Sequence, residues 1–236
     1  MPADVPPARR RRYLAANAVQ VTASGGNLRL APRRGLSNIG GMARKLSDPD
    51  VSATSLAGQI LIAMPAMGDP RFTQSVIFLC DHSARGAMGI VVNRPLENPS
   101  FEDLLRQLSI DPVPPARSIR LCSGGPVDNA RGFVLHSADW TGEGSLRVDD
   151  SFALTASLDI LKAIAGGGGP RQGVLALGYA GWGPGQLDLE MQQNAWLSAP
   201  ADPALLFDGE YETKWRRALA TLRIDPLLLS HVAGRA

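Results

Sequence analysis

Apolar residues along the chain gather in short blocks bounded by glycine, proline or charged residues, a pattern typical of buried β-strands. Residues 58–65 (GQILIAMP) predict a first strand that ends at Pro65. Residues 72–80 and 86–93 predict two more strands, and the polar segment between them has the length of a hairpin turn. Further strands are expected at 119–122, 131–137, 145–148, 173–181 and 195–200.

Helical periodicity is clearest in residues 100–110, where four apolar residues recur on one face. Ser100 and Asp103 stand three residues apart at the start of this segment, and this spacing is a capping signature. Further helices are expected at 154–169, 184–194 and 211–222.

Strands and helices follow one another without the regular βαβ rhythm of a parallel sheet and without an internal repeat. The chain has 236 residues, enough for one sizeable core. These features favour a single α+β domain with a mixed β-sheet.

Charge is unevenly distributed. Residues 1–47 carry a net charge of +8, whereas the remainder carries −6. We expect residues 1–55 to form a basic, disordered extension and residues 56–236 to form the domain, because the extension is too poor in apolar residues to build a core. Two alternatives stay open: a tether to nucleic acid or another anionic surface, and a translation start at Met42.

Composition also narrows the class of protein. The chain has only two cysteines, so we do not expect a disulfide framework. We expect a cytoplasmic location for the same reason. No apolar run approaches the roughly 18 residues that a membrane helix needs, so no membrane association is expected.

The segment 178–191 (GYAGWGPGQLDLEM) raises the question of a phosphate-binding loop, because an apolar strand runs through glycines into a helix. Its spacing is Gly181-x-Gly183-x-Gly185, which matches neither the dinucleotide fingerprint nor a P-loop. Pro184 removes one N–H donor and suits an early helical position. A tight corner in the fold is favoured, and a ligand-binding loop remains the alternative.

Catalytic and metal-binding patterns are weak. Cys122 or Ser123 could act as a nucleophile with His82 or His136 as base, but no nucleophile-elbow motif is present. Paired metal-ligand spacings are also lacking, so we expect no metal and no cofactor. A surface ion pair is favoured over anion binding for Arg94.

Three ordered blocks of the sequence carry a family resemblance. They are LAGQILIAMPAMGDPRFTQSVIFLCDHSARGAMGIVVNRP, GGPVDNARGFVLH and LALGYAGWGPGQLDLEMQQNAWL. They resemble the signature blocks of the AlgH/YqgE-like bacterial proteins over roughly residues 56–230. The resemblance implies a bifurcated, partly barrel-like sheet surrounded by helices. It also brings the label of transcriptional regulator, although no groove-reading motif is present and the acidic body opposes DNA binding.

The motif positions that match these blocks, together with Gly183 of the glycine loop, mark the expected functional surface. They are Met64, Pro65, Met67, Phe72, His82, Gly89, Asn93, Arg94, Gly124, Gly125, Pro126, Gly181, Trp182, Gly183, Gly185, Gln186 and Glu190.

The leading functional hypothesis is a non-catalytic regulatory or binding role with a protein or small-molecule partner. The alternative is a small-molecule or nucleotide-binding domain with weak hydrolase activity that uses the loop Gly181–Gly185 and Arg94. Direct DNA binding is not expected from the folded body, and the basic extension is the only part of the sequence that suggests it.

Overall fold

The computed structural model describes residues 55–112, 117–226 and 229, together with the backbone of three short strands nearer the N-terminus. The helices are η1 (Pro70–Phe72, a 3₁₀ helix), α2 (Phe101–Gln107), α3 (Leu158–Ala165), α4 (Gln186–Gln192), α5 (Pro203–Phe207) and α6 (Tyr211–Thr221). The strands are β1 (Val19–Gln20), β2 (Thr22–Ser24), β3 (Asn27–Arg29), β4 (Gln59–Ala63), β5 (Val76–Ser83), β6 (Gly86–Val91), β7 (Arg120–Ser123), β8 (Val127–Ser137), β9 (Ser145–Arg147), β10 (Phe152–Thr155), β11 (Gly173–Trp182) and β12 (Trp196–Pro200).

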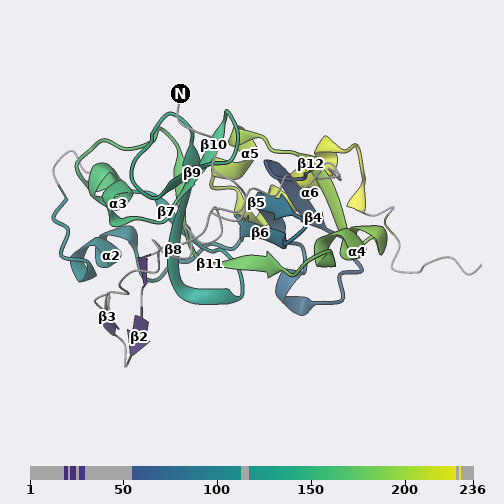
Figure 1. Cartoon of the computed structure of the whole chain (residues 1–236), viewed down its shortest axis with the longest axis horizontal. Helices are drawn as coiled ribbons and strands as arrows, with labels where there is room; N and C mark the ends of the chain where they lie inside the picture. Colours follow the sequence, from purple (N-terminus) through teal and green to yellow (C-terminus); the bar gives the residue numbers. More distant parts are fainter. Residues whose placement is uncertain are drawn as a thin grey trace, which may run out of the picture.

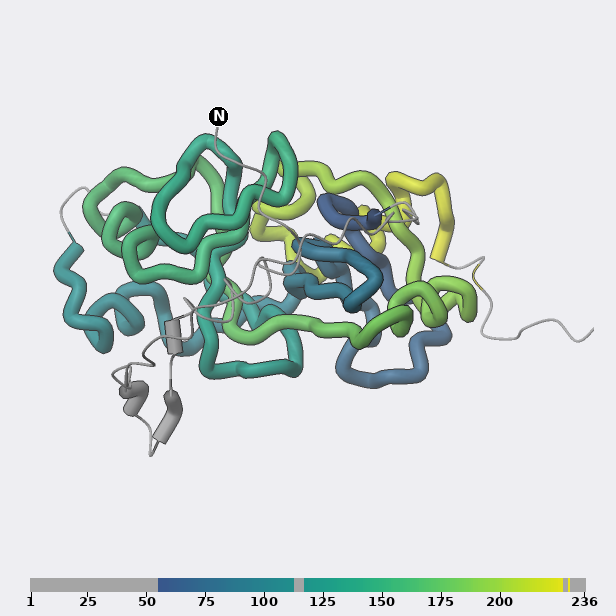
Figure 2. The backbone as a smooth tube through the Cα atoms, viewed as in Figure 1, coloured from purple at the N-terminus to yellow at the C-terminus, as the bar shows by residue number. Residues whose placement is uncertain are grey.

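One curled sheet organises the described part of the chain, in the order β12-β4-β5-β6-β11-β8-β10-β9, with β7 also paired to β11 and β1 to β8. Within it, only the pair β7–β11 is parallel. Helices α2 and α3 lie at one end, whereas α4 and α6 lie at the other (Figure 1). The backbone trace shows the same two ends joined through β8 and β11 (Figure 2). The predicted α+β fold with a partly barrel-like sheet is confirmed.

The sheet divides along β11. The first half of β11 lies between β7 and β8, whereas its last three residues pair with β6. The chain passes from β7 to β8 across β11 through Gly124 and Gly125. A Cβ atom on Gly125 would lie 2.2 Å from the carbonyl carbon of Tyr179, so only glycine permits this close crossing. Gly178, with φ of 75°, lies at the register shift where β11 changes partners.

Both faces of the β4–β5 region are buried, which explains their nearly continuous apolar sequences. Ile60 and Phe78 belong to the core inside the curl, whereas Leu61 and Ile77 belong to the cluster that includes Trp182 and Trp196 of the opposite face. Successive side chains of a strand point to opposite faces, so each strand contributes to both clusters.

The helix predicted for residues 100–110 is confirmed as α2. Its N-terminus has a reciprocal capping box, in which Asp103 N–H donates to Ser100 Oγ at 3.1 Å and Ser100 N–H donates to Asp103 Oδ2 at 3.1 Å. The apolar face of α2 packs with α3 against β7, β8 and β11.

Other element boundaries differ from the prediction. The segment 154–169 was expected to be one helix, but Phe152–Thr155 forms β10 between β8 and β9, and α3 begins only at Leu158. All four residues of β10 are buried, and this tertiary pairing overrides helical periodicity. Phe72 lies in η1 rather than at the start of a strand, and α5 was not predicted.

The predicted basic extension, residues 1–55, contains the short strands β1–β3, and β1 pairs with β8. The rest of it up to residue 54 lies outside the described residues, so its predicted disorder stays a prediction. Within the described part of the chain, none of the helices has the length and apolar character needed to cross a bilayer.

Candidate functional site

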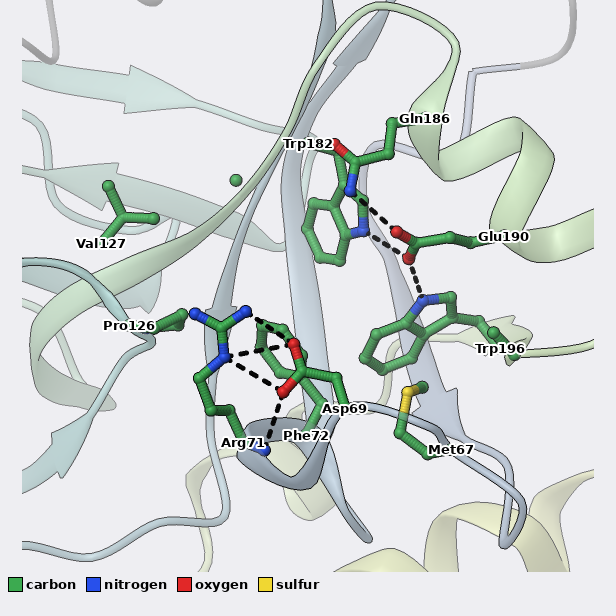
Figure 3. A pocket seen from close by; sticks show the side chains of 12 residues that line it. Met67, Asp69, Arg71, Phe72, Pro126, Val127, Trp182, Gln186, Glu190 and Trp196 are labelled. Carbon is green, nitrogen blue, oxygen red and sulfur yellow. Dashed lines mark hydrogen bonds and ion pairs between the residues drawn. The ribbon is translucent and has the colours of Figure 1, made fainter.

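A pocket of about 300 Å³ opens where η1, β11, α4 and β12 meet (Figure 3). Seven of the expected site residues line it: Met67, Phe72, Pro126, Gly181, Trp182, Gln186 and Glu190. Five further lining residues were not expected: Asp69, Arg71, Val127, Ala195 and Trp196. Segments from three distant parts of the sequence, residues 67–72, 126–127 and 181–196, therefore meet at one pocket.

Glu190 holds one side of the pocket together. Its Oε2 accepts hydrogen bonds from the indole N–H groups of Trp182 at 2.9 Å and Trp196 at 2.7 Å. Its Oε1 accepts one from Gln186 Nε2 at 2.8 Å. Helix α4 presents Gln186 and Glu190 on one face because the two residues are four apart. A carboxylate thus satisfies two buried indoles that have no other donor or acceptor atoms in their side chains.

Three aromatic rings form the apolar part of the pocket. Phe72 lies 6.5 Å from Trp182 and 5.6 Å from Trp196 between ring centroids, and the two indoles lie 5.9 Å apart. The indole rings of Trp182 and Trp196 meet edge to face. In this arrangement the edge of one ring lies against the electron-rich face of the other. The site therefore combines a polarisable aromatic wall with a fixed carboxylate.

Asp69 and Arg71 form the opposite side (Figure 3). Asp69 caps η1, because its Oδ1 accepts from Arg71 N–H at 3.0 Å, and Pro70 occupies the first helical turn. The guanidinium of Arg71 donates to both carboxylate oxygens. This hydrogen bonding lowers the pKa of Asp69 and raises that of Arg71. The Arg71 Cζ atom lies 5.9 Å from the Phe72 ring centroid.

The glycine loop at the start of α4 does not present a free phosphate cradle. Gly183 N–H donates to Gln186 Oε1 at 3.0 Å, and Pro184 has no N–H. Gly185 is the N-cap residue with φ of 67°, so Pro184 precedes α4 instead of lying within it. Helix α4 has only seven residues. The loop functions here as a corner that sets the position of Gln186 and Glu190.

Four expected residues lie near the pocket but shape its surroundings. Met64 and Pro65 form the turn after β4, where Met64 O accepts from Met67 N–H at 2.9 Å. Asn93 links two strands by accepting from Val76 N–H and donating to Gln74 O. Arg94 donates to Thr73 O at 2.7 Å and to Ser75 Oγ at 3.4 Å.

Among the described residues, Arg94 forms no ion pair with a carboxylate, so the favoured surface ion pair is not found. Its hydrogen bonds fix the loop before β5, and they leave the proposed anion site without support.

His82 and the paired glycines also lie outside the pocket lining. His82 Nδ1 accepts from Leu56 N–H at 3.1 Å, and its Nε2 lies 3.4 Å from Asp188 Oδ1 on α4. It therefore joins the start of the domain to α4. Gly124 and Gly125 form the crossing over β11, and Gly89 packs against β5 with its Cα facing Ile77.

Of the two candidate nucleophiles, Cys122 is buried and inaccessible, whereas Ser123 is partly exposed. Burial raises the pKa of the Cys122 thiol to about 12, and its Sγ donates to Val91 O. Burial also lowers the pKa of His136, whose Nε2 lies 2.8 Å from Thr155 Oγ1. In the described part of the chain, no three His, Cys, Asp or Glu side chains gather in a way that could hold a metal ion.

The contribution of Trp196 could not be found from the sequence. It lies six residues beyond Glu190, across the turn from α4 to β12, and no helical or strand period links them. Asp69 and Arg71 did carry a signal, because Asp-Pro is typical of a helix start.

A family model described as AlgH-like matches residues 60–227. The chain belongs to the AlgH-like family. The resemblance predicted from the three sequence blocks is therefore confirmed. Among relatives of this AlgH-like chain, a UPF0301 protein of Rhodospirillum rubrum is 56% identical over 181 residues, which cover 77% of this chain and 94% of the relative. A UPF0301 protein of Gluconobacter oxydans is 54% identical over 183 residues, covering 77% and 98%.

Solved structures agree with the fold of this AlgH-like protein. The solution structure of AlgH from Pseudomonas aeruginosa is 45% identical, with a TM-score of 0.63, and the match covers 82% of this chain and all of that one. A crystal structure of a Corynebacterium diphtheriae protein, 21% identical with a TM-score of 0.56, covers 80% and 94% and shares the fold.

Proposed function

We propose that this protein is a non-catalytic binding protein whose small-molecule ligand occupies the pocket lined by Phe72, Trp182, Glu190 and Trp196. The observation that carries the proposal is the combination of a 300 Å³ pocket, three aromatic rings and a carboxylate held by fixed donors. Small-ligand sites are typically concave and apolar, with a few polar groups that fix orientation.

The engagement of the charged groups at this pocket supports binding rather than catalysis, because Asp69 pairs with Arg71 and Glu190 accepts three hydrogen bonds. Its lining contains no cysteine, histidine, serine or lysine. Both cysteines of the chain are buried elsewhere. A protein that binds a ligand without transforming it fits a regulatory role, in which ligand binding changes the affinity for a partner.

Indole signals in ¹H–¹⁵N NMR spectra provide the test. The chain has four tryptophans, of which Trp182 and Trp196 line the pocket, whereas Trp140 packs on His136 and Trp215 donates to Ala63 O. A panel of neutral, cationic and anionic fragments is titrated into the protein. We expect saturable shifts of the two pocket indoles with little change at the other two.

The Phe72→Ala variant removes one wall and should weaken binding. Leu189→Ala is the matched control, because Leu189 is an exposed apolar residue of α4 outside the pocket lining. The proposal is wrong if no fragment shifts the pocket indoles. It is also wrong if the purified protein turns over a substrate at a rate that a single substitution at the pocket abolishes.

A further inference from the structure

The charges that line the pocket do not balance. Asp69 and Arg71 pair with each other, so their charges cancel. Glu190 accepts hydrogen bonds from two indoles and one amide, all of which are neutral donors. Among the described residues, no basic side chain forms an ion pair with Glu190. The pocket therefore holds one negative charge that no cation offsets.

The aromatic rings favour the same sign of ligand. The faces of Phe72, Trp182 and Trp196 carry negative partial charge, which attracts cations placed within about 6 Å of a ring centroid. Arg71 already shows this preference, because its guanidinium lies over Phe72 while Asp69 holds it. The Arg71 side chain is 65% exposed, so it covers the pocket only at its edge.

We propose that the ligand of this pocket is an organic cation, with an ammonium or guanidinium group carried on a small apolar body. This inference rests on the proposed binding function and specifies its ligand. The cation offsets the charge of Glu190 and contacts the ring faces, and its apolar body fills the space beside Met67 and Pro126. An anionic ligand would meet two carboxylates and a single, already paired guanidinium.

Ligands of one shape and three charges test the proposal on the unmodified protein. Choline, the neutral 3,3-dimethylbutan-1-ol and the anionic 3,3-dimethylbutanoate differ mainly in charge. Methylguanidinium and neutral N-methylacetamide form a second set. Binding is measured from the indole signals of Trp182 and Trp196 at constant ionic strength, because salt screens charge interactions. We expect at least one cation to bind about tenfold more tightly than its neutral counterpart.

The outcomes separate this inference from the proposed function. If the neutral or anionic compounds bind as tightly as the cations, the cation inference is wrong and the pocket remains a binding site. If no compound of any charge shifts the pocket indoles, the proposed function fails as well. Blocked arginine and lysine derivatives distinguish a free cation from a side chain of a partner protein, because tighter binding of these derivatives assigns the cation to a protein.

Two variants should change the cation preference in opposite directions. Glu190→Gln removes the unpaired charge, so the preference for choline over its neutral isostere should fall to about threefold or less, the part that the ring faces supply. Arg71→Gln removes the competing guanidinium and leaves Asp69 unpaired, so cations should bind about threefold more tightly. Glu212→Gln is the control, because it removes the same charge from an exposed position on α6. Weaker cation binding in Arg71→Gln would contradict the proposal.

Discussion

Replacing Glu190 with alanine should destabilise the protein, because it removes the acceptor of two buried indole N–H groups. Trp182 and Trp196 are 4% and 2% exposed, and both donate to the same oxygen of Glu190. A buried donor without a partner costs about 1–3 kcal/mol, so the pair could cost about 2–6 kcal/mol. Glu190 itself is half-buried, and water that enters the vacated space recovers part of this cost. We expect a loss of about 3 kcal/mol in the free energy of unfolding.

Urea denaturation followed by circular dichroism measures this loss without relying on tryptophan fluorescence. Glu190→Gln keeps one acceptor oxygen and should lose less, about 1–2 kcal/mol. Glu212→Ala, which truncates an exposed glutamate of α6, should change stability by less than about 0.5 kcal/mol. A double-mutant cycle between Glu190→Gln and Trp196→Phe should give a coupling energy of about 1 kcal/mol. A Glu190→Ala protein as stable as the unmodified one would refute the reasoning.

Three further predictions concern the crossing, the thiols and a buried histidine. Gly125→Ala places a Cβ atom 2.2 Å from a backbone carbon of β11 at φ of 148°, so we expect loss of soluble folded protein, whereas Gly68→Ala, with nothing within 4 Å, should keep its Tm. Burial raises the pKa values of the Cys80 and Cys122 thiols, the latter to about 12. Ellman's reagent at pH 8 should therefore label neither thiol until urea unfolds the chain. Rapid labelling of the native protein would contradict this burial. Burial lowers the pKa of His136, so the imidazole binds a proton more readily in the unfolded chain than in the folded one. The free energy of unfolding should therefore fall as pH drops below about 6.5. The His136→Asn variant should show a smaller pH dependence of this free energy.

The sequence predicted those parts of the fold that depend on neighbouring residues. The hairpin of β5 and β6 and the capped helix α2 follow from local turn and capping chemistry. The strand β10 did not, because its buried state comes from pairing with β8 and β9. The segment that contains it satisfies a helical period, and only the tertiary pairing decides between the two.

The candidate site, too, could be predicted only where its residues depend on their neighbours in the sequence. Glu190 and Trp182 stand in one sequence block, and the glycine corner that brings them together was expected as a turn. Trp196 stands in the same block but reaches the pocket from β12, and Arg71 reaches it from η1, so no helical or strand period joins either residue to Glu190. Asn93 and Arg94 occupied motif positions, yet their hydrogen bonds hold loops in place.

The crossing of the chain at Gly125 and the pocket both lie where the pairing of β8 with β11 ends. Pairing between β8 and β11 ends at Val127 and Tyr179, because the chain crosses β11 at Gly125 just before β8 begins. Val127, at the last β8–β11 pair, and Gly181, which pairs with Met88 of β6, consequently line the pocket. Any substitution that disturbs the crossing therefore alters the fold and the pocket together. Loss of binding in a glycine variant would not identify a ligand contact, so tests of ligand recognition belong at Phe72 and Glu190, where the side chains can change while the crossing remains.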